Sequence, residues 1–305
     1  MITRLAAVVV ALSCLGGHSG AAASAAPGGD APGALTFGGL HRTYLLHAPA
    51  GVRRPVGLVL NLHGAGATGG AQAALTNYNA VADQNGFVVV YPDGIDFSWA
   101  DGRGASIPDR QGVDDVGFLV ALINQVTSDF GIERSHVFVT GMSAGAFMAT
   151  RLACERADVV AAIAPVSGTL ATNFPCSPSR PVSVLQVHGT ADPVVPYNGG
   201  TMVGRGGVSD IVAAPAMADR WRALDGCSGM PVSDMPANVG DGAGIQRVDA
   251  GGCADGTEVD FVRVDGGGHT WPAGRFSLPS ASVGSTTQAF DASQASGQFF
   301  AQHNR

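Results

Sequence analysis

Lysine is absent from this chain of 305 residues, and all 17 of its basic residues are arginine. Schiff-base catalysis, a serine–lysine dyad and a phosphate-binding loop of the Walker type all need the ammonium group of lysine. The absence therefore excludes these three kinds of chemistry.

Positive charge is scarce in the chain as a whole, with 17 basic against 24 acidic residues and a net charge of -7. The negative field that results repels nucleic acids and anionic membrane surfaces, so neither is expected as a partner. Only 13% of the residues are charged and 46% are hydrophobic, which is typical of one well-packed domain.

The N-terminal residues have the pattern of a targeting segment. Arg4 precedes the apolar run Leu5 to Leu15, and small residues follow at Ala23-Ser24-Ala25. This order is typical of a secretory signal peptide, and the apolar run is too short to span a membrane. The sequence therefore predicts an exported chain without a membrane span.

We expect a signal peptide over residues 1–25, a flexible segment over 26–34 and one domain over 35–305. The flexible segment is predicted from its many glycine, alanine and proline residues. A lipoprotein anchored through Cys14 is the alternative. Ala11 disfavours the anchor, because a large aliphatic residue is usual three positions before the lipidated cysteine.

Four cysteines remain after the predicted cleavage: Cys154, Cys176, Cys227 and Cys253. An even number in an exported chain favours disulfides, and the chain has no C-x-x-C pair that would suggest a metal site. Of three possible pairings we expect Cys154–Cys176 and Cys227–Cys253, because each closes a short loop and stabilises the fold by about 3 kcal/mol. The alternative is four buried thiols.

Short apolar runs alternate with helical patterns along most of the chain. Strands are expected at 41–47, 56–62, 87–91, 137–140, 159–166, 182–187 and 259–264, and helices at about 75–82, 114–130, 146–156 and 288–303. This alternation predicts an α/β fold, in which a mainly parallel sheet is covered by helices on both faces. Right-handed crossovers then place the loops after the strands on one edge of the sheet, where ligands bind.

The segment Gly141 to Gly145 reads Gly-Met-Ser-Ala-Gly and fits G-x-S-x-G. It lies between a β-branched strand and a helix, which is the setting of a nucleophile elbow, and Ser143 is the candidate nucleophile. In a chain with 44 glycines, an ordinary glycine turn is the alternative. The elbow is favoured because its glycines stand where neighbouring backbone has to pass without a Cβ clash.

A serine hydroxyl needs a base and an acid, and in this fold the chain order is serine, acid, histidine. Only His269 and His303 lie late enough to be the base, and His303 is expected on the surface of the last helix. Asp192 follows a predicted strand and is the candidate acid, with Asp265 in reserve. The alternative role for Asp192 is to begin an Asp-Pro turn.

The glycine-rich loop after the strand at 56–62 contains candidate donors for an oxyanion hole. Backbone N–H groups there can stabilise the negative charge that develops on a substrate carbonyl. We expect Ala65 to supply one donor and Ala144, next to the nucleophile, to supply the other. A plain tight turn is the alternative, and His63 is expected to be structural.

The chain resembles the polyhydroxybutyrate depolymerase-like esterases, which include the LpqC-type esterases and the feruloyl and acetyl xylan esterases of carbohydrate esterase family one. The matching stretches span most of the predicted mature chain and are Leu62 to Gly64, Val113 to Phe118, Thr140 to Gly145, His188 to Asp192, and Gly267 to Pro272.

The resemblance implies an α/β-hydrolase with Ser143 as nucleophile, Asp192 as acid and His269 as base, and it supports the local disulfide pairs. Many relatives carry a cysteine or another residue after the glycine of this loop, where this chain has Ala65. The resemblance therefore does not fix which residue of the loop donates to the oxyanion.

The expected activity is that of a secreted, monomeric serine esterase that works through an acyl-enzyme without a cofactor or metal. The expected substrates are polyhydroxyalkanoate oligomers, feruloyl esters or acetyl esters. Extracellular depolymerases that attack solid polyester usually carry a linker and a substrate-binding domain, and only 36 residues follow His269. The resemblance therefore favours soluble or oligomeric esters over crystalline polymer. Candidate walls of the substrate pocket are Trp99, Tyr197 and Trp271, although half-buried aromatic residues are also common without such a role.

Two other functions fit parts of the sequence. A peptidase related to the prolyl oligopeptidases would share the triad and its chain order, but no gating domain is visible in this chain. A catalytically silent secreted binding protein is disfavoured, because serine, acid and histidine are all present in the expected order.

Overall fold

The computed structural model describes residues 28–229, 232–233, 237–238 and 244–303. The predicted signal peptide and Cys14 lie outside these residues. Within the described part of the chain, no helix is long and apolar enough to cross a membrane.

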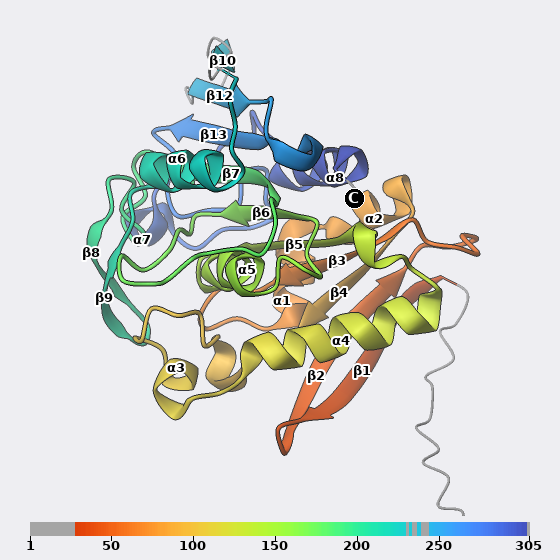
Figure 1. Ribbon diagram of the computed structural model, residues 1–305. Coiled ribbons are helices and arrows are strands. Elements are labelled where there is room, and N and C mark those ends of the chain that lie inside the picture. The colour runs from red at the N-terminus through yellow and green to blue at the C-terminus, as the bar shows by residue number, and fades with distance from the viewer. Residues whose placement is uncertain (1–27, 230–231, 234–236, 239–243, 304–305) are drawn as a thin grey trace, which may run out of the picture.

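The core of the molecule is one twisted sheet of 11 strands (Figure 1). Its strand order is β1 (Gly29–Phe37), β2 (Leu40–Ala48), β4 (Phe87–Pro92), β3 (Gly57–Leu62), β5 (Val137–Met142), β6 (Ala162–Val166), β7 (Ser183–Gly189), β13 (Val259–Asp265), β12 (Gly244–Ala250) and β10 (Val232–Ser233), while β11 (Ala237–Asn238) also pairs with β12. The six strands from β4 to β13 are parallel. Antiparallel strands extend the sheet at both ends.

Helices cover both faces of the sheet (Figure 1). One apolar core packs against α4 (Asp115–Phe130), α5 (Ala144–Glu155) and α6 (Ala214–Leu224). The other packs against α1 (Gly69–Thr76), α2 (Tyr78–Asn85) and α8 (Ala292–Gln302). The mainly parallel α/β architecture predicted from the sequence is therefore confirmed.

The remaining elements lie outside the central layers. They are the hairpin of β8 (Gly200–Gly204) and β9 (Gly207–Ile211), the short helices α3 (Ile107–Gln111) and α7 (Ser280–Val283), and the 3-10 turns η1 (Ile95–Phe97), η2 (Arg134–His136) and η3 (Ala254–Gly256).

The central strands are buried along their whole length, which explains their sequences. Every residue of β3, β4 and β7 is buried. A strand covered on both faces has no solvent side, so its apolar run is continuous and does not alternate. Since both faces are covered, the loops at the carboxyl ends of these strands are the exposed places where a site can form.

The structure differs from the sequence expectation at residues 29–34, which were expected to be flexible. They form most of β1, which pairs with β2 from Gly29 opposite Ala48 to Phe37 opposite Leu40. Glycine and proline are tolerated there because β1 is an edge strand with one unpaired side. The pairing compensates for the scarcity of large apolar side chains in this segment.

Two disulfides fasten loops to this framework. Cys154 at the end of α5 is joined to Cys176, and Cys227 just after α6 is joined to Cys253. Each bridge closes a short stretch of chain, 22 and 26 residues apart, as the local pairing predicted. The bridges reduce the conformational freedom of the unfolded chain.

Candidate active site

Ser143 stands on a strained turn between β5 and α5. Its backbone angles are φ 55° and ψ −120°, a conformation that residues with a side chain rarely adopt. A Cβ on Gly141 would lie 2.7 Å from the carbonyl oxygen of Leu62, and a Cβ on Gly145 would lie 2.1 Å from it. The two glycines are therefore required for β5 and α5 to pack closely against β3, which is the geometry of a nucleophile elbow.

Asp192 lies in the loop that follows β7, and only 6% of its surface is exposed. Its Oδ1 accepts hydrogen bonds from the backbone N–H groups of Val194 and Val195, both at 2.8 Å. These two bonds hold the carboxylate in one orientation and leave its other oxygen free to face His269.

His188 supports the same loop from inside the protein. Its Nε2 donates to the carbonyl oxygen of Val195 at 2.9 Å and lies 3.7 Å from Asp192 Oδ2. Burial lowers the pKa of His188, which keeps this imidazole neutral. His188 is therefore a structural neighbour of the acid.

His269 lies in the loop after β13 and is 8% exposed. Its Nδ1 is 2.9 Å from Asp192 Oδ2. A carboxylate in this position holds Nδ1 in its protonated state, which leaves the lone pair of Nε2 available to accept a proton. The loop passes so close to its neighbours that a Cβ on Gly268 would lie 2.1 Å from the carbonyl oxygen of Val283.

Ser143 and His269 line the same pocket, whose volume is about 270 Å³. Within the described residues no hydrogen bond joins the two side chains. Such bonds are often long without substrate and tighten in the complex. The structure thus brings all three residues that the sequence singled out to the carboxyl ends of the parallel strands.

Most of the pocket wall is apolar. Its side chains come from α1, from the loop after His269 and from α7: Leu75, Trp271, Phe276, Leu278 and Val283. Phe276 and Leu278 are 54% and 68% exposed, so they form a rim open to solvent. Sequence reasoning missed these two residues, and the only signal was their apolar character in a loop directly after the candidate base.

The loop after β3 also lines the pocket, through residues 64–67. A Cβ on Gly64 would lie 3.4 Å from Ser143 Cβ, so this loop passes directly beside the serine. Ala65 is exposed in the loop, and Ala144 is the first residue of α5. In the described part of the chain, neither backbone N–H donates a hydrogen bond.

His63 holds this loop in place and has no exposed surface. Its Nδ1 donates to the carbonyl oxygen of Gly64 at 2.8 Å, and its Nε2 accepts from the N–H of Gly94 at 2.9 Å. Burial lowers the pKa of His63, so the ring stays neutral as these bonds require. Its predicted structural role agrees with this geometry.

The three aromatic residues predicted to line the pocket have different positions. Trp271 lines it, with its indole N–H donating to Ser293 Oγ at 2.9 Å. Trp99 is fully buried behind the loop and donates to the carbonyl oxygen of His63 at 2.9 Å. Tyr197 packs against Phe261 instead. Trp99 and Tyr197 therefore do not line this pocket, because core packing holds both rings elsewhere.

The reserve acid Asp265 does not contact His269. It pairs at the surface with Arg263, whose Nε lies 2.8 Å from Asp265 Oδ1. Asp192 is therefore the carboxylate that the structure places behind the imidazole.

Among the described residues, three acidic side chains lie close together away from the pocket: Asp249 on β12, Glu258 just before β13, and Asp260 on β13. Arg247 pairs with Asp249 and Asp260, and His303 Nε2 lies 3.0 Å from Glu258. The carboxylates are thus already matched by neighbouring side chains, and none of them lines the pocket of Ser143.

Several relatives match long parts of the chain. A putative esterase, NocK from Nocardia uniformis subsp. tsuyamanensis, is 29% identical over 266 residues, which cover 83% of this chain and 77% of that protein. A probable feruloyl esterase C from Aspergillus niger is 31% identical over 192 residues, covering 63% and 60%. Feruloyl esterase B from Piromyces equi is 32% identical over 179 residues, and the match spans 32% of its length.

Among solved structures, an acetyl xylan esterase from Aspergillus awamori superposes with a TM-score of 0.55 at 16% identity. The match covers 79% of this chain and 94% of that one, and it shows a shared α/β-hydrolase fold. The family model described as esterase PHB depolymerase matches residues 42–221, which include the elbow and Asp192. The chain therefore belongs to this family and is a carboxylic ester hydrolase.

Proposed function

We propose that the protein is a secreted serine esterase in which Ser143, His269 and Asp192 form the catalytic triad. One observation carries the proposal: His269, which is hydrogen-bonded to Asp192, lines the same pocket as a serine held in strained backbone angles. Strain of this kind is concentrated at functional sites, where it exposes a reactive side chain.

The reaction proceeds through an acyl-enzyme. His269 Nε2 takes the proton of the Ser143 hydroxyl while the oxygen attacks the ester carbonyl, and the same imidazole then gives that proton to the leaving alcohol. Water then enters, gives a proton to His269 Nε2 and attacks the acyl carbonyl, and the imidazolium returns this proton to Ser143 Oγ as the bond to the acyl group breaks and the acid leaves. Asp192 stays ionised throughout and stabilises the imidazolium that forms twice in each cycle.

Ala65 and Ala144 are the proposed donors to the oxyanion. Both backbone N–H groups are free of partners in the described chain; Ala65 lines the same pocket as Ser143, and Ala144 directly follows Ser143. Donors that are already in place need no reorganisation as charge develops, and one such donor accelerates catalysis by about 10² to 10³.

The proposed substrates are polyhydroxyalkanoate oligomers, feruloyl esters or acetyl esters. The family supports the first class, and the feruloyl and acetylxylan esterases among the relatives support the other two. The apolar wall, which includes Trp271 and Phe276, suits an acyl or aromatic group, and no metal or cofactor takes part in the proposed mechanism. A product screen with methyl ferulate, acetylated xylan and hydroxybutyrate oligomers distinguishes the three.

Export through the predicted signal peptide is part of the same proposal. Two disulfides support it, because such bonds persist in oxidising compartments. A monomer that meets its ester substrate outside the cell is the proposed working form.

The test of the triad is Ser143→Ala. Hydrolysis of 4-nitrophenyl butyrate should fall to the background rate while the circular dichroism spectrum and thermal midpoint stay close to those of the wild type. An unchanged turnover number would refute the assignment of the nucleophile.

A further inference from the structure

The tip of the β8–β9 hairpin is fastened close to the active site. Figure 1 shows the hairpin reaching along one side of the molecule toward α3. Arg110 in α3 donates from Nη1 to the carbonyl oxygen of Gly206 at 2.8 Å. A Cβ on Gly206 would lie 2.4 Å from the carbonyl oxygen of Ala105, so the tip is tightly packed there.

Arg205, next to Gly206, extends from this tip to the loop that lines the pocket. Its Nη1 lies 3.6 Å from the position that a Cβ on Gly66 would take. Its guanidinium carbon is 5.7 Å from the centre of the Phe97 ring, within the range of a cation–π contact. Phe97 is itself tied to the loop, because its carbonyl oxygen accepts from the N–H of Gly66 at 2.8 Å.

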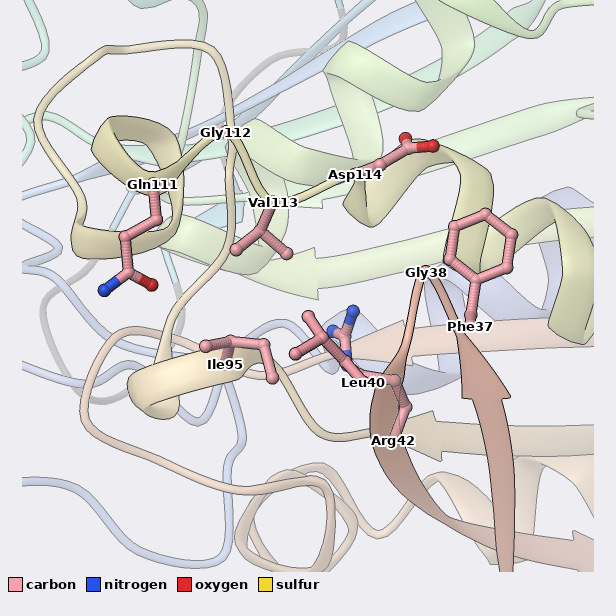
Figure 2. Close-up of a pocket in the computed structure, with 9 residues that line it drawn as sticks. All are labelled: Phe37, Gly38, Leu40, Arg42, Ile95, Gln111, Gly112, Val113 and Asp114. Carbon is pink, nitrogen blue, oxygen red and sulfur yellow. The ribbon is translucent and has the colours of Figure 1, made fainter.

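The guanidinium of Arg205 has no carboxylate partner among the described residues. Arg42, which lines a separate cavity near α4 (Figure 2), pairs with Asp115 at 2.6 Å. Arg103, beside the same hairpin, pairs with Asp101 at 2.6 Å. Arg205 is exposed, and no carboxylate of the described residues pairs with its guanidinium, so it is available to bind an anion.

Ser143 and Arg205 lie beside two residues of the same short loop. Gly64 adjoins Ser143, and Gly66 lies two residues further on, at most about 7.6 Å away by Cα spacing. The apolar wall that contains Leu75 and Trp271 comes from other elements. A substrate bound at Ser143 can thus have an apolar part against that wall and an anionic part beside Arg205.

We propose that Arg205 selects esters that carry a carboxylate on the part of the substrate lying over Gly66. The inference rests on the proposed esterase function of Ser143 and adds the charge of the preferred substrate. A guanidinium recognises a carboxylate through two parallel N–H···O bonds, which a neutral ester cannot form equally well.

The test compares esters that differ only in this carboxylate. One pair is mono(4-nitrophenyl) glutarate and 4-nitrophenyl butyrate, with the charge on the acyl side. The other is 3-acetoxybutanoate and its methyl ester, with the charge on the alcohol side. For each pair, the measured quantity is the ratio of kcat/KM for the anionic ester to that for the neutral ester, corrected for spontaneous hydrolysis.

We expect Arg205→Gln to lower this ratio about tenfold for at least one pair, since a charge-assisted bond is lost. Arg205→Lys should retain part of the preference. Arg53→Gln is the matched control, because this exposed arginine precedes β3 and so lies at the amino ends of the parallel strands, away from the pocket at their carboxyl ends. High salt should reduce the preference of the wild type, since exposed charges are screened.

A ratio that is the same in wild type and Arg205→Gln for both pairs would overturn the inference while leaving the esterase function intact. A wild-type protein that hydrolyses none of the four esters would overturn both. Measuring ratios separates a lost preference from a general loss of activity in the variant.

Discussion

Asp192→Asn removes the negative charge behind His269 while it preserves the shape of the side chain. The backbone N–H groups of Val194 and Val195 donate to Oδ1 at 2.8 Å, so in the variant they should hold the amide oxygen in the place of Oδ1. The new NH₂ group then takes the place of Oδ2 and faces His269 Nδ1. An NH₂ group can only donate, which forces the proton of the imidazole onto Nε2. A protonated Nε2 cannot accept the proton of Ser143.

The expected loss follows from this change of tautomer. In a serine protease the same substitution lowers kcat by about 10⁴, which corresponds to ~5.5 kcal/mol of activation free energy. Because both backbone hydrogen bonds are kept, the free energy of unfolding should change much less. The assay is the turnover number with 4-nitrophenyl butyrate, together with the thermal midpoint of each variant.

Asp265→Asn is the control, since Asp265 pairs with Arg263 and does not touch His269. It should keep nearly all of the wild-type activity. A folded Asp192→Asn variant that lost less than tenfold in kcat, or an Asp265→Asn variant that lost as much as Asp192→Asn, would contradict the role assigned to Asp192.

Two further predictions concern the framework of the site. Gly145→Ala should abolish activity and lower the thermal midpoint, because the new Cβ would lie 2.1 Å from the carbonyl oxygen of Leu62. Gly70→Ala is the control and should be neutral or slightly stabilising, because the nearest atom to its new Cβ is 4.0 Å away. Equal thermal midpoints for the two variants would contradict this prediction. His63 has a lowered pKa in the folded protein, so its contribution to stability is complete above its unfolded pKa of about 6.5 and is lost as the pH falls toward the folded value. The difference in free energy of unfolding between wild type and His63→Asn, measured by urea titration, should therefore shrink between pH 7.5 and 5.5 by up to about 1.4 kcal/mol per pH unit, and a constant difference would argue against a neutral imidazole.

The central strands and the three triad candidates were predictable from the sequence for simple reasons. A strand buried on both faces has a continuous apolar run, as in β3 and β4. Loops that follow parallel strands meet at one edge, so Ser143, Asp192 and His269 were expected together although they are far apart in the chain. Chain order then eliminated most of the other histidines.

The walls of the pocket were less predictable, because they depend on which way each side chain packs. Trp99 and Trp271 both follow glycine-containing loops, yet Trp99 turns into the core behind His63 and Trp271 faces the pocket. Local sequence does not record this difference, which arises from contacts between distant segments. The position of Arg205 likewise depends on how the tip of a hairpin packs against α3.

At the edge strand β1 the prediction from the sequence was wrong. Its glycine, alanine and proline residues predicted a flexible segment, but backbone pairing with β2 orders it. Amino-acid composition indicates how much apolar surface a segment can bury. It says little about an edge strand that is held in place by backbone hydrogen bonds to its neighbour.

Stoichiometric labelling with a fluorophosphonate, followed by peptide mapping, tests whether Ser143 is the nucleophile. We expect one adduct per molecule, on the peptide that contains Ser143, and no adduct in the Ser143→Ala variant. A folded wild-type protein that does not react, or an adduct on a different residue, would contradict this assignment.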